Sequence, residues 1–346
     1  MSETMQAVVL EKFGGPEVLD NLCEVPVPTP GPTEVLVRVR SCAVCYLDTI
    51  VRSGIRPGVE LPLILGHEIA GEVVEPGAAV AGLSPGDRVA STYRGVCGHC
   101  WYCRAERSAL CDNVRAMGLD RDGGYAQYVV LPATSISPIP GGVTDDAATI
   151  AGCVLGAVWK GVVQKGRIRP GETVLVTGAG GGAGIHSVQM AKLAGARVLA
   201  LTTSPGKIGA IQAAGADEVL CGTNDEILGR VKELTSGRGV NVVLECVGKA
   251  TAGLSFRALE KGGRLVLIGE LGVEPTPFSV PRMLYRETEV YGVASPSAGE
   301  LAQVLELINR GEFTPAVGTV LPLSEAATAH QLLADRAHTG RIILHP

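Results

Sequence analysis

The chain has 346 residues, a length that favours two domains over one core. Hydrophobic residues make up 46% and charged residues 19%, a balance that allows large cores and argues against disorder. The net charge of −5 disfavours a surface for nucleic acid or for an anionic membrane.

The cysteine count bears on the compartment of the protein. The first fifteen residues lack a basic segment followed by an apolar one, so we expect no signal peptide. We expect no apolar run of the length needed to span a bilayer, and the cytoplasm is the expected location. Structural disulfides are not expected there, so metal ligation or simple burial must explain most of the ten cysteines.

The first 150 residues are predicted to be rich in β-structure. They contain short segments with β-branched residues and partial alternation, at 6–14, 34–44, 69–77 and 87–92. Stretches rich in proline and glycine, which are typical of turns, join these segments.

The pattern changes after about residue 150. Strands are predicted at 172–178, 197–202, 217–221, 240–248, 264–270 and 288–295, and helices at 187–196, 207–216, 226–237 and 250–263. Strands that alternate with helices predict βαβ units and a doubly wound parallel sheet, so the fold class is α/β.

The tail resumes the style of the first part, with helices at 298–311 and 324–336 and strands at 315–321 and 340–346. We therefore predict a catalytic domain made of residues 1–152 and 294–346. A dinucleotide-binding Rossmann domain, residues 153–293, is inserted into it.

Four cysteines occur close together within 97–111. Short C-x-x-C spacings let one loop present several sulfurs to a tetrahedral ion, and four thiolates make a closed structural zinc site. Disulfides or an iron–sulfur cluster are the alternatives, but the signal-free chain disfavours the former and the spacing differs from usual cluster runs. We predict zinc bound by Cys97, Cys100, Cys103 and Cys111, with His99 not a ligand.

A glycine-rich stretch follows the strand at 172–178 and opens the next helix. Glycine lets the backbone approach a pyrophosphate, which then lies at the helix N-terminus. A tight turn with close helix packing is the alternative, but the strand–turn–helix context favours a dinucleotide site. Its predicted residues are Gly178, Gly181, Gly182, Ala183 and Gly184.

The end of the second strand of this domain bears on the choice of cofactor. NAD sites usually carry a carboxylate there, which would repel a 2′-phosphate. This chain has Thr202, Thr203, Ser204 and, slightly later, Lys207. Hydroxyl donors and a lysine suit a phosphate, so NADP(H) is favoured over NAD(H). The alternative for Lys207 is a solvated charge at a helix start.

Cys45, His67 and Cys153 are too far apart in the sequence to be joined by spacing alone. From the residues alone, His67 is more often a satisfied structural histidine than a ligand, and Cys153 a buried small residue. However, the ordered set of C-x-x-D at 45–48, GHE at 66–68, the four cysteines, the isolated Cys153 and the glycine-rich βαβ unit resembles the zinc-dependent medium-chain dehydrogenase/reductase family, the alcohol dehydrogenase superfamily. The resemblance covers the whole chain.

The resemblance implies a GroES-like catalytic domain in which Cys45, His67 and Cys153 hold a catalytic zinc with one open position. Glu68 would lie next to the metal and visit it as a ligand. Asp48 would accept a hydrogen bond from His67 and fix its tautomer. A homodimer or homotetramer acting on a small molecule is also implied.

The resemblance also carries over to the cofactor site. Gly181 and Gly184 would be nearest the phosphates, while Ala179 stands where a glycine is usual. Arg341 would reach the pyrophosphate from the catalytic domain, the alternative being a surface strand residue.

The proton relay of alcohol dehydrogenases is missing. Members of the family often pass the proton through Ser or Thr two residues after the zinc cysteine and His five residues after it, but here these are Leu47 and Ile50. Tyr46 is the nearest titratable replacement, unless it is an aromatic wall or a phosphate contact. Ile50 and Tyr93 are predicted to line the substrate pocket.

Three functions follow as hypotheses. Retention of all three zinc ligands favours a zinc- and NADP-dependent alcohol dehydrogenase or carbonyl reductase, which we place first. Loss of the relay favours an NADPH-dependent enoyl reductase, and the residues near 45–48, 184–189 and 202–207 are similar to the acryloyl-CoA reductase type. A non-enzymatic NADPH-binding redox sensor is the third.

Overall fold

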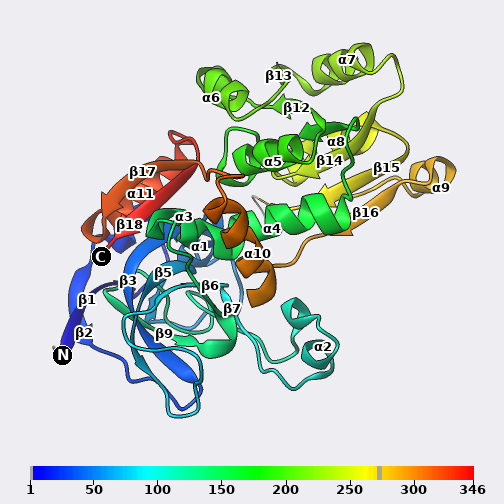
Figure 1. Ribbon diagram of the computed structural model, residues 1–346. Coiled ribbons are helices and arrows are strands. Elements are labelled where there is room, and N and C mark those ends of the chain that lie inside the picture. The colour runs from blue at the N-terminus through cyan, green and yellow to red at the C-terminus, as the bar shows by residue number, and fades with distance from the viewer. Residues whose placement is uncertain (1–2, 271–274) are drawn as a thin grey trace. The chain divides into compact units, whose positions relative to one another are not determined.

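The computed structural model describes residues 3–270 and 275–346, and the chain forms two compact units (Figure 1). The first unit comprises Met1–Gly156 and Ser295–Pro346, and the second comprises Ala157–Ala294. The first boundary lies a few residues later than predicted, so Cys153 belongs to the first unit and not to the inserted one.

The first unit is built from antiparallel sheets. Its larger sheet has the order β10-β6-β5-β3-β18-β17, with β9 also paired to β3, and a smaller one has the order β2-β1-β4. Only the pairing of β17 with β18 is parallel in the larger sheet. The strands are β1 (Thr4–Leu10), β2 (Leu22–Pro26), β3 (Glu34–Val44), β4 (Leu63–Ile64), β5 (Glu68–Pro76), β6 (Arg88–Ser91), β7 (Arg94–Gly95), β8 (Arg115–Ala116), β9 (Tyr128–Pro132), β10 (Ile136–Pro138), β17 (Val317–Pro322) and β18 (Arg341–His345).

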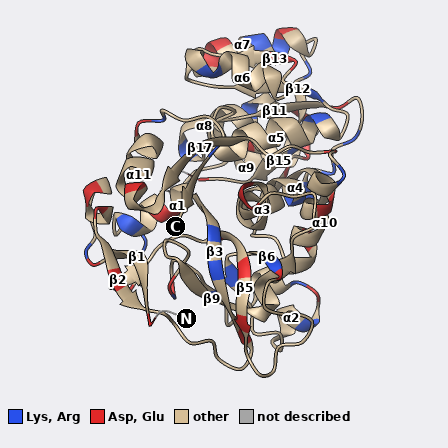
Figure 2. Ribbon diagram, turned by 60° about the vertical axis from the view of Figure 1, so that its left-hand side comes forward, with Lys and Arg blue, Asp and Glu red and all other residues tan. Residues whose placement is uncertain are grey.

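Alternation along β3 explains how this sheet covers its core. Val35, Val37 and Val39 are buried in the apolar cluster of the unit, whereas Arg40 is exposed and pairs with Glu72 of β5 at 2.8 Å. Figure 2 shows basic residues of β3 beside acidic residues of β5. Along this part of β3, one face is therefore apolar and the other carries charged side chains, as the period of two requires.

The second unit is a parallel sheet of six strands in the order β13-β12-β11-β14-β15-β16. The strands are β11 (Thr173–Val176), β12 (Arg197–Leu201), β13 (Glu218–Leu220), β14 (Val240–Glu245), β15 (Leu259–Leu267) and β16 (Glu289–Gly292). Val174, Leu175 and Val176 in β11 are all fully buried, as in a strand covered on both faces. The order and the parallel pairing confirm the predicted α/β class with a doubly wound sheet.

Helices of the second unit connect its strands. Figure 1 shows α5 (Gly182–Leu193) and α8 (Lys249–Ala258) beside the sheet, where α5 contacts β11 and β12 and α8 contacts β14 and β15. The remaining helices of this unit are α6 (Ile208–Ala213), α7 (Asn224–Leu234) and α9 (Val280–Arg286). The first unit contains α1 (Tyr46–Arg52), α2 (Trp101–Arg104), α3 (Asp145–Ile150), α10 (Ala298–Asn309) and α11 (Ala326–Ala334).

Several helices differ from the sequence prediction. The helix predicted over 250–263 ends at Ala258, because Leu259 is buried and pairs with Val240 in the sheet, and Gly262 has a positive φ of 71°. A helix over Asp145–Lys165 was not predicted. It contains α3, π-helical turns at Ala151–Leu155 and Lys160–Lys165, and α4 (Gly156–Trp159) between them.

By length and composition, the helix over Asp145–Lys165 would suffice to cross a membrane, and it is the one such helix among the described residues. Inspection of the sequence missed it because charged residues flank the apolar stretch 147–159, which is too short by itself. In the structure, 67% of its most apolar window is buried, as in the core helix of a compact protein.

Candidate metal centre and cofactor site

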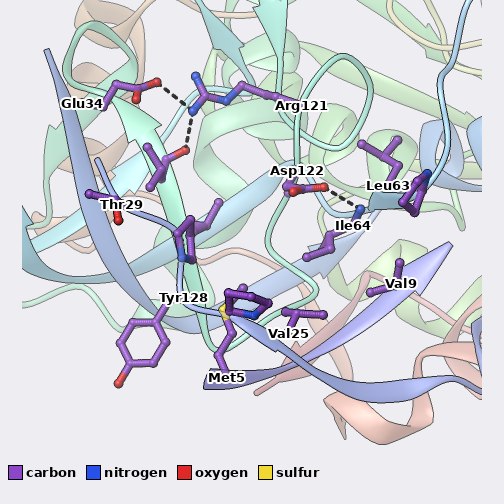
Figure 3. A pocket seen from close by; sticks show the side chains of 16 residues that line it. Met5, Val9, Val25, Thr29, Glu34, Leu63, Ile64, Arg121, Asp122 and Tyr128 are labelled. Carbon is purple, nitrogen blue, oxygen red and sulfur yellow. Dashed lines mark hydrogen bonds and ion pairs between the residues drawn. The ribbon is translucent and has the colours of Figure 1, made fainter. Parts of the chain in front are cut away.

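A cavity in the first unit is lined by none of the predicted site residues. It has a volume of about 440 Å³, and Met5, Val9, Val25 and Tyr128 are among the side chains that line it (Figure 3). The charged groups in its wall already have partners: Arg121 pairs with Glu34 at 2.8 Å, and Asp122 accepts from Ile64 N at 2.9 Å. We therefore build the site from the cysteine and histidine groups.

The four cysteines of the 97–111 segment converge as predicted. Their sulfur atoms all lie within 4.8 Å of one another. Cys100 N donates to Cys97 Sγ at 3.4 Å, and Asn113 Nδ2 donates to it at 3.7 Å. The backbone N–H groups of His99 and Cys100 lower the pKa of Cys97 to about 5, so this sulfur is readily a thiolate. His99 is exposed and its ring bonds Cys97 O, outside the sulfur group.

A second group forms within the first unit. Ligand atoms of Cys45, His67, Glu68 and Cys153 also lie within 4.8 Å of one another. His67 and Glu68 are fully buried. The structure thus brings together the dispersed residues that spacing alone did not join.

The fold explains this convergence. Ala43 of β3 pairs with Glu68 of β5 across the antiparallel ladder, so Cys45 and His67 occupy the same end of two neighbouring strands. Cys153 lies in the π-helical turn Ala151–Leu155. One turn earlier, Thr149 Oγ1 donates to Glu68 O at 2.7 Å and so holds this helix against β5.

The ring of His67 is oriented for metal binding. Its Nδ1 lies 2.8 Å from Asp48 Oδ1, and Asp48 Oδ2 accepts from Cys45 N at 2.8 Å. The other ring nitrogen, Nε2, is buried and has no hydrogen-bond partner among the described residues. An unpartnered buried nitrogen beside two thiols is what a zinc ligand set requires.

The electrostatics of the group favour a cation. A hydrogen bond from Cys153 lowers the pKa of Cys45 well below its ordinary value. Burial lowers the pKa of His67, but the charges of Asp48 and Cys45 outweigh it and raise this pKa well above its ordinary value. The surroundings of the imidazole therefore stabilise positive charge, which a metal ion supplies.

Glu68 has a partner besides the metal group. Burial raises its pKa to about 7, although Arg341 opposes this shift. Glu68 Oε1 accepts from Arg341 Nη2, whereas Oε2 has no hydrogen-bond partner in the described structure. Arg341 is only 6% exposed, so it is not a surface strand residue. Its contact with pyrophosphate stays a prediction.

The residues at the positions of the missing relay lie in α1, directly after Cys45. Leu47 packs against the core of the first unit, and Ile50 is half-buried. Tyr46 is half-buried in the first turn of α1, where its carbonyl accepts from Thr49 Oγ1 at 2.7 Å. The Tyr93 ring meets the His67 ring edge-on, with centroids 5.2 Å apart, so Tyr93 borders the metal group.

The glycine-rich turn has the geometry of a dinucleotide-binding loop. Gly178 follows β11 with a φ of 58°, and α5 starts at Gly182 with Gly181 as its N-cap. A Cβ on Gly184 would lie 2.1 Å from Gly178 O, so only glycine allows this approach of helix and turn. Ala183 lies in the first turn of the helix.

The residues after β12 divide into buried and accessible groups. Thr202 is 4% exposed and its hydroxyl accepts from Ser204 N at 3.1 Å. Thr203 is exposed and Ser204 is half-buried. Lys207 extends across Gly180, and its Nζ donates to Gly180 O at 3.4 Å. A cation therefore lies directly beside the glycine-rich turn.

Two residues near the metal group were not predicted from the sequence. Tyr125 and His330 are fully buried, and the Tyr125 hydroxyl is hydrogen-bonded to both Asp48 and His330. No pattern in the sequence indicated them, because Tyr125 precedes β9 and His330 lies in α11, far along the chain.

Two family models match this chain. The alcohol dehydrogenase GroES-like domain matches residues 31–141, which include Cys45, His67 and the four-cysteine segment. The zinc-binding dehydrogenase model matches residues 182–310. The chain belongs to the zinc-binding dehydrogenases of the medium-chain dehydrogenase/reductase family. The predicted family and the GroES-like plus Rossmann architecture are thereby confirmed.

Relatives of this zinc-binding dehydrogenase have different names. It is 36% identical over 324 residues to the acryloyl-coenzyme A reductase of Metallosphaera sedula, covering 93% of this chain and 95% of the relative. It is 32% identical to an NAD-dependent alcohol dehydrogenase of Saccharolobus solfataricus, covering 99% and 100%. The crystal structure of AibC superposes with a TM-score of 0.92 at 40% identity, over 99% of this chain and 96% of that one.

Proposed function

We propose that this zinc-binding dehydrogenase uses NADPH to reduce a C=C bond conjugated to a carbonyl group, with enoyl thioesters as the substrate class. The observation that carries the proposal is that Leu47 and Ile50, at the positions where alcohol dehydrogenases often carry proton-relay residues, have apolar side chains that cannot carry a proton. The name of the acryloyl-coenzyme A reductase, which is similar over nearly the whole chain, supports the same class.

The chemistry of this reduction does not need the relay. Hydride from NADPH would form a C–H bond at the β-carbon and leave NADP⁺, the C=C electrons would move toward the carbonyl oxygen, and the α-carbon would take one proton from solvent. Zinc, when bound, is a Lewis acid that polarises a carbonyl oxygen. Cys45, His67 and Cys153 would hold the metal, and Tyr93 and Ile50 would border the substrate.

Reduction of an aldehyde or ketone, or oxidation of an alcohol, is the second candidate. The complete set of three ligands favours it, and so does the name of the similar alcohol dehydrogenase. A purely sensory role is disfavoured by membership of an oxidoreductase family. An NADPH-oxidation screen of aldehydes, ketones, enones and enoyl-CoA esters with the zinc-loaded protein separates the two activities. We expect the highest kcat/KM with an enoyl-CoA ester, and a clear preference for simple aldehydes would favour the second candidate.

The proposed cofactor is NADP(H). The absence of a carboxylate after β12, together with Thr203, Ser204 and Lys207, supports it. Since a charge-assisted hydrogen bond contributes about 1.5–3 kcal/mol, NADPH should bind about tenfold to a hundredfold more tightly than NADH. Thr202→Asp should reverse this preference and Thr202→Asn should not, because only the former adds a repelling charge. Equal dissociation constants for both cofactors in the unmodified protein, measured by calorimetry, would contradict the proposal.

We further propose a homodimer or homotetramer in the cytoplasm. Strand β16 is at the edge of its sheet, and α9, which precedes it, exposes Val280, Leu284 and Tyr285 by 72%, 69% and 80%. An open strand edge beside exposed apolar side chains suits association with a second copy. Sedimentation of the unmodified protein tests this, and a monomer at micromolar concentration would contradict it.

A further inference from the structure

We propose that His330 and Tyr125 are positioning residues for the metal centre. They form a hydrogen-bonded chain that ends on Asp48 and, through Asp48, orients the ring of His67. The inference rests on the proposed metal site and deepens it, since it assigns part of the zinc affinity to residues that do not touch the metal.

The direction of the chain is set by Arg52. Its Nη1 lies 3.1 Å from His330 Nδ1, and a guanidinium can only donate, so Nδ1 must accept. The hydrogen of the neutral ring is then on Nε2, which lies 3.0 Å from the Tyr125 hydroxyl. Burial lowers the pKa of His330 to about 4, in agreement with a neutral ring. Arg52 Nε also donates to Gly14 O at 3.2 Å, which holds the guanidinium in place.

The remaining hydrogens follow from this first assignment. Because the Tyr125 oxygen accepts from His330, its own hydrogen is free to point to Asp48 Oδ2, at 3.3 Å. Asp48 Oδ1 accepts from His67 Nδ1 at 2.8 Å. In the neutral ring, the hydrogen is then on Nδ1, and the lone pair of His67 Nε2 is available to a metal ion. Each link sets the orientation of the next one, from Arg52 to His67.

The chain is rigid because its members are packed. Tyr125 and His330 are fully buried and their rings meet edge-on, with an interplanar angle of 89°. The Tyr125 ring also lies over Gly66, where a Cβ would come within 2.4 Å of it. Gly66 directly precedes His67, so Tyr125 supports the histidine through its backbone as well as through Asp48.

Residues that orient a ligand of a metal typically change its affinity by about 10–100-fold when they are replaced. The test is the zinc dissociation constant of the full-length protein, measured by competition with a chelator. Zinc should leave the two sites in two separate steps as the chelator concentration rises. The step that is absent in Cys153→Ala is the release of zinc from the metal centre. We expect Tyr125→Phe and His330→Leu each to raise that dissociation constant about 10–100-fold. The four-thiolate step should stay unchanged.

Two further variants distinguish positioning from general destabilisation. His330→Gln keeps an N–H donor for Tyr125 and should restore most of the affinity, and the control Tyr128→Phe should have no effect. If His330 acts through Tyr125, the double variant Tyr125→Phe/His330→Leu should bind zinc no more weakly than Tyr125→Phe. The absorption bands of Co²⁺ in the metal centre should shift in both single variants.

The outcomes separate the two claims. Dissociation constants within twofold of the unmodified protein in both single variants, or equal weakening at the four-thiolate site, would overturn the positioning role. Uptake of zinc only at the four-thiolate site by the unmodified protein would overturn the metal centre and the positioning role together.

Discussion

The four cysteines of one thiol site lie within residues 97–111, whereas the ligands of the other come from the end of β3, the start of β5 and a π-helical turn. The first site lies in an exposed segment, where Trp101 is 65% exposed, and its four sulfurs would saturate a tetrahedral ion. The second contains the buried imidazole of His67, and its three predicted ligands would leave a coordination position open. We therefore expect the local ligands to make a site for stability and the dispersed ligands to make one for chemistry.

The two sites also differ in the groups that form hydrogen bonds with their ligands. Around Cys97 the interactions are mainly backbone N–H groups and Asn113. Around His67 they form a network through Asp48 and Tyr125 to His330. A catalytic metal centre needs residues that do not touch the metal to orient its ligands through hydrogen bonds. An open coordination position leaves fewer metal–ligand bonds to define the geometry.

Removal of one ligand from each site gives the largest expected contrast. Cys153→Ala should lose about one equivalent of zinc and reduce turnover to the level of the background, while the fold remains intact. Cys103→Ala should also lose zinc but mainly lower the unfolding temperature, because binding at a structural site is folding free energy. The measurements are elemental analysis, turnover and thermal unfolding, with Cys221→Ala as control. A content of one zinc ion or none per unmodified chain, by elemental analysis, would contradict the presence of two separate zinc sites.

Restoring a relay beside the open site should have the next largest effect. Positioned acid–base groups contribute about 10²–10⁴-fold in rate, so Leu47→Ser with Ile50→His should raise alcohol oxidation within that range, most clearly near neutral pH. Reduction of C=C bonds should barely change, since it releases no alcohol proton. If Tyr46 replaces the relay, Tyr46→Phe should lower alcohol turnover by a similar factor. A gain in C=C reduction equal to the gain in alcohol oxidation would contradict the assigned role of these positions.

The same contrast explains what the sequence could predict. The four-cysteine site followed from spacing, because all its ligands lie in one loop, and the doubly wound sheet followed from the alternation of strands and helices. Cys45, His67 and Cys153 were joined only by family resemblance, since their proximity depends on the β3–β5 register and on the helix over 145–165. Tyr125, His330 and Arg52 were missed entirely, because tertiary packing alone makes them neighbours.

The buried hydrogen-bond network around His330 should have a smaller effect, on the free energy of unfolding at acidic pH. His330 faces Asp48, Arg52 and Tyr125, and burial lowers its pKa to about 4 in the folded protein, below an ordinary value of about 6.5. The unfolded chain therefore binds a proton first, so stability present above about pH 6.5 is lost as the pH falls toward 4. The loss from this group is on the order of 3 kcal/mol. Urea unfolding of His330→Gln should show a shallower pH dependence in this window, and an identical slope would contradict the assignment.

The central claim is that the dispersed, open site reduces a conjugated C=C bond. It is tested most directly with an α,β-unsaturated ketone, which offers the C=C and C=O bonds in one molecule, and with NADPH carrying deuterium at the transferred position of C4. Reduction of the C=C bond should give a saturated ketone with deuterium on the β-carbon, seen by NMR of the product. An allylic alcohol with deuterium on the former carbonyl carbon would contradict it.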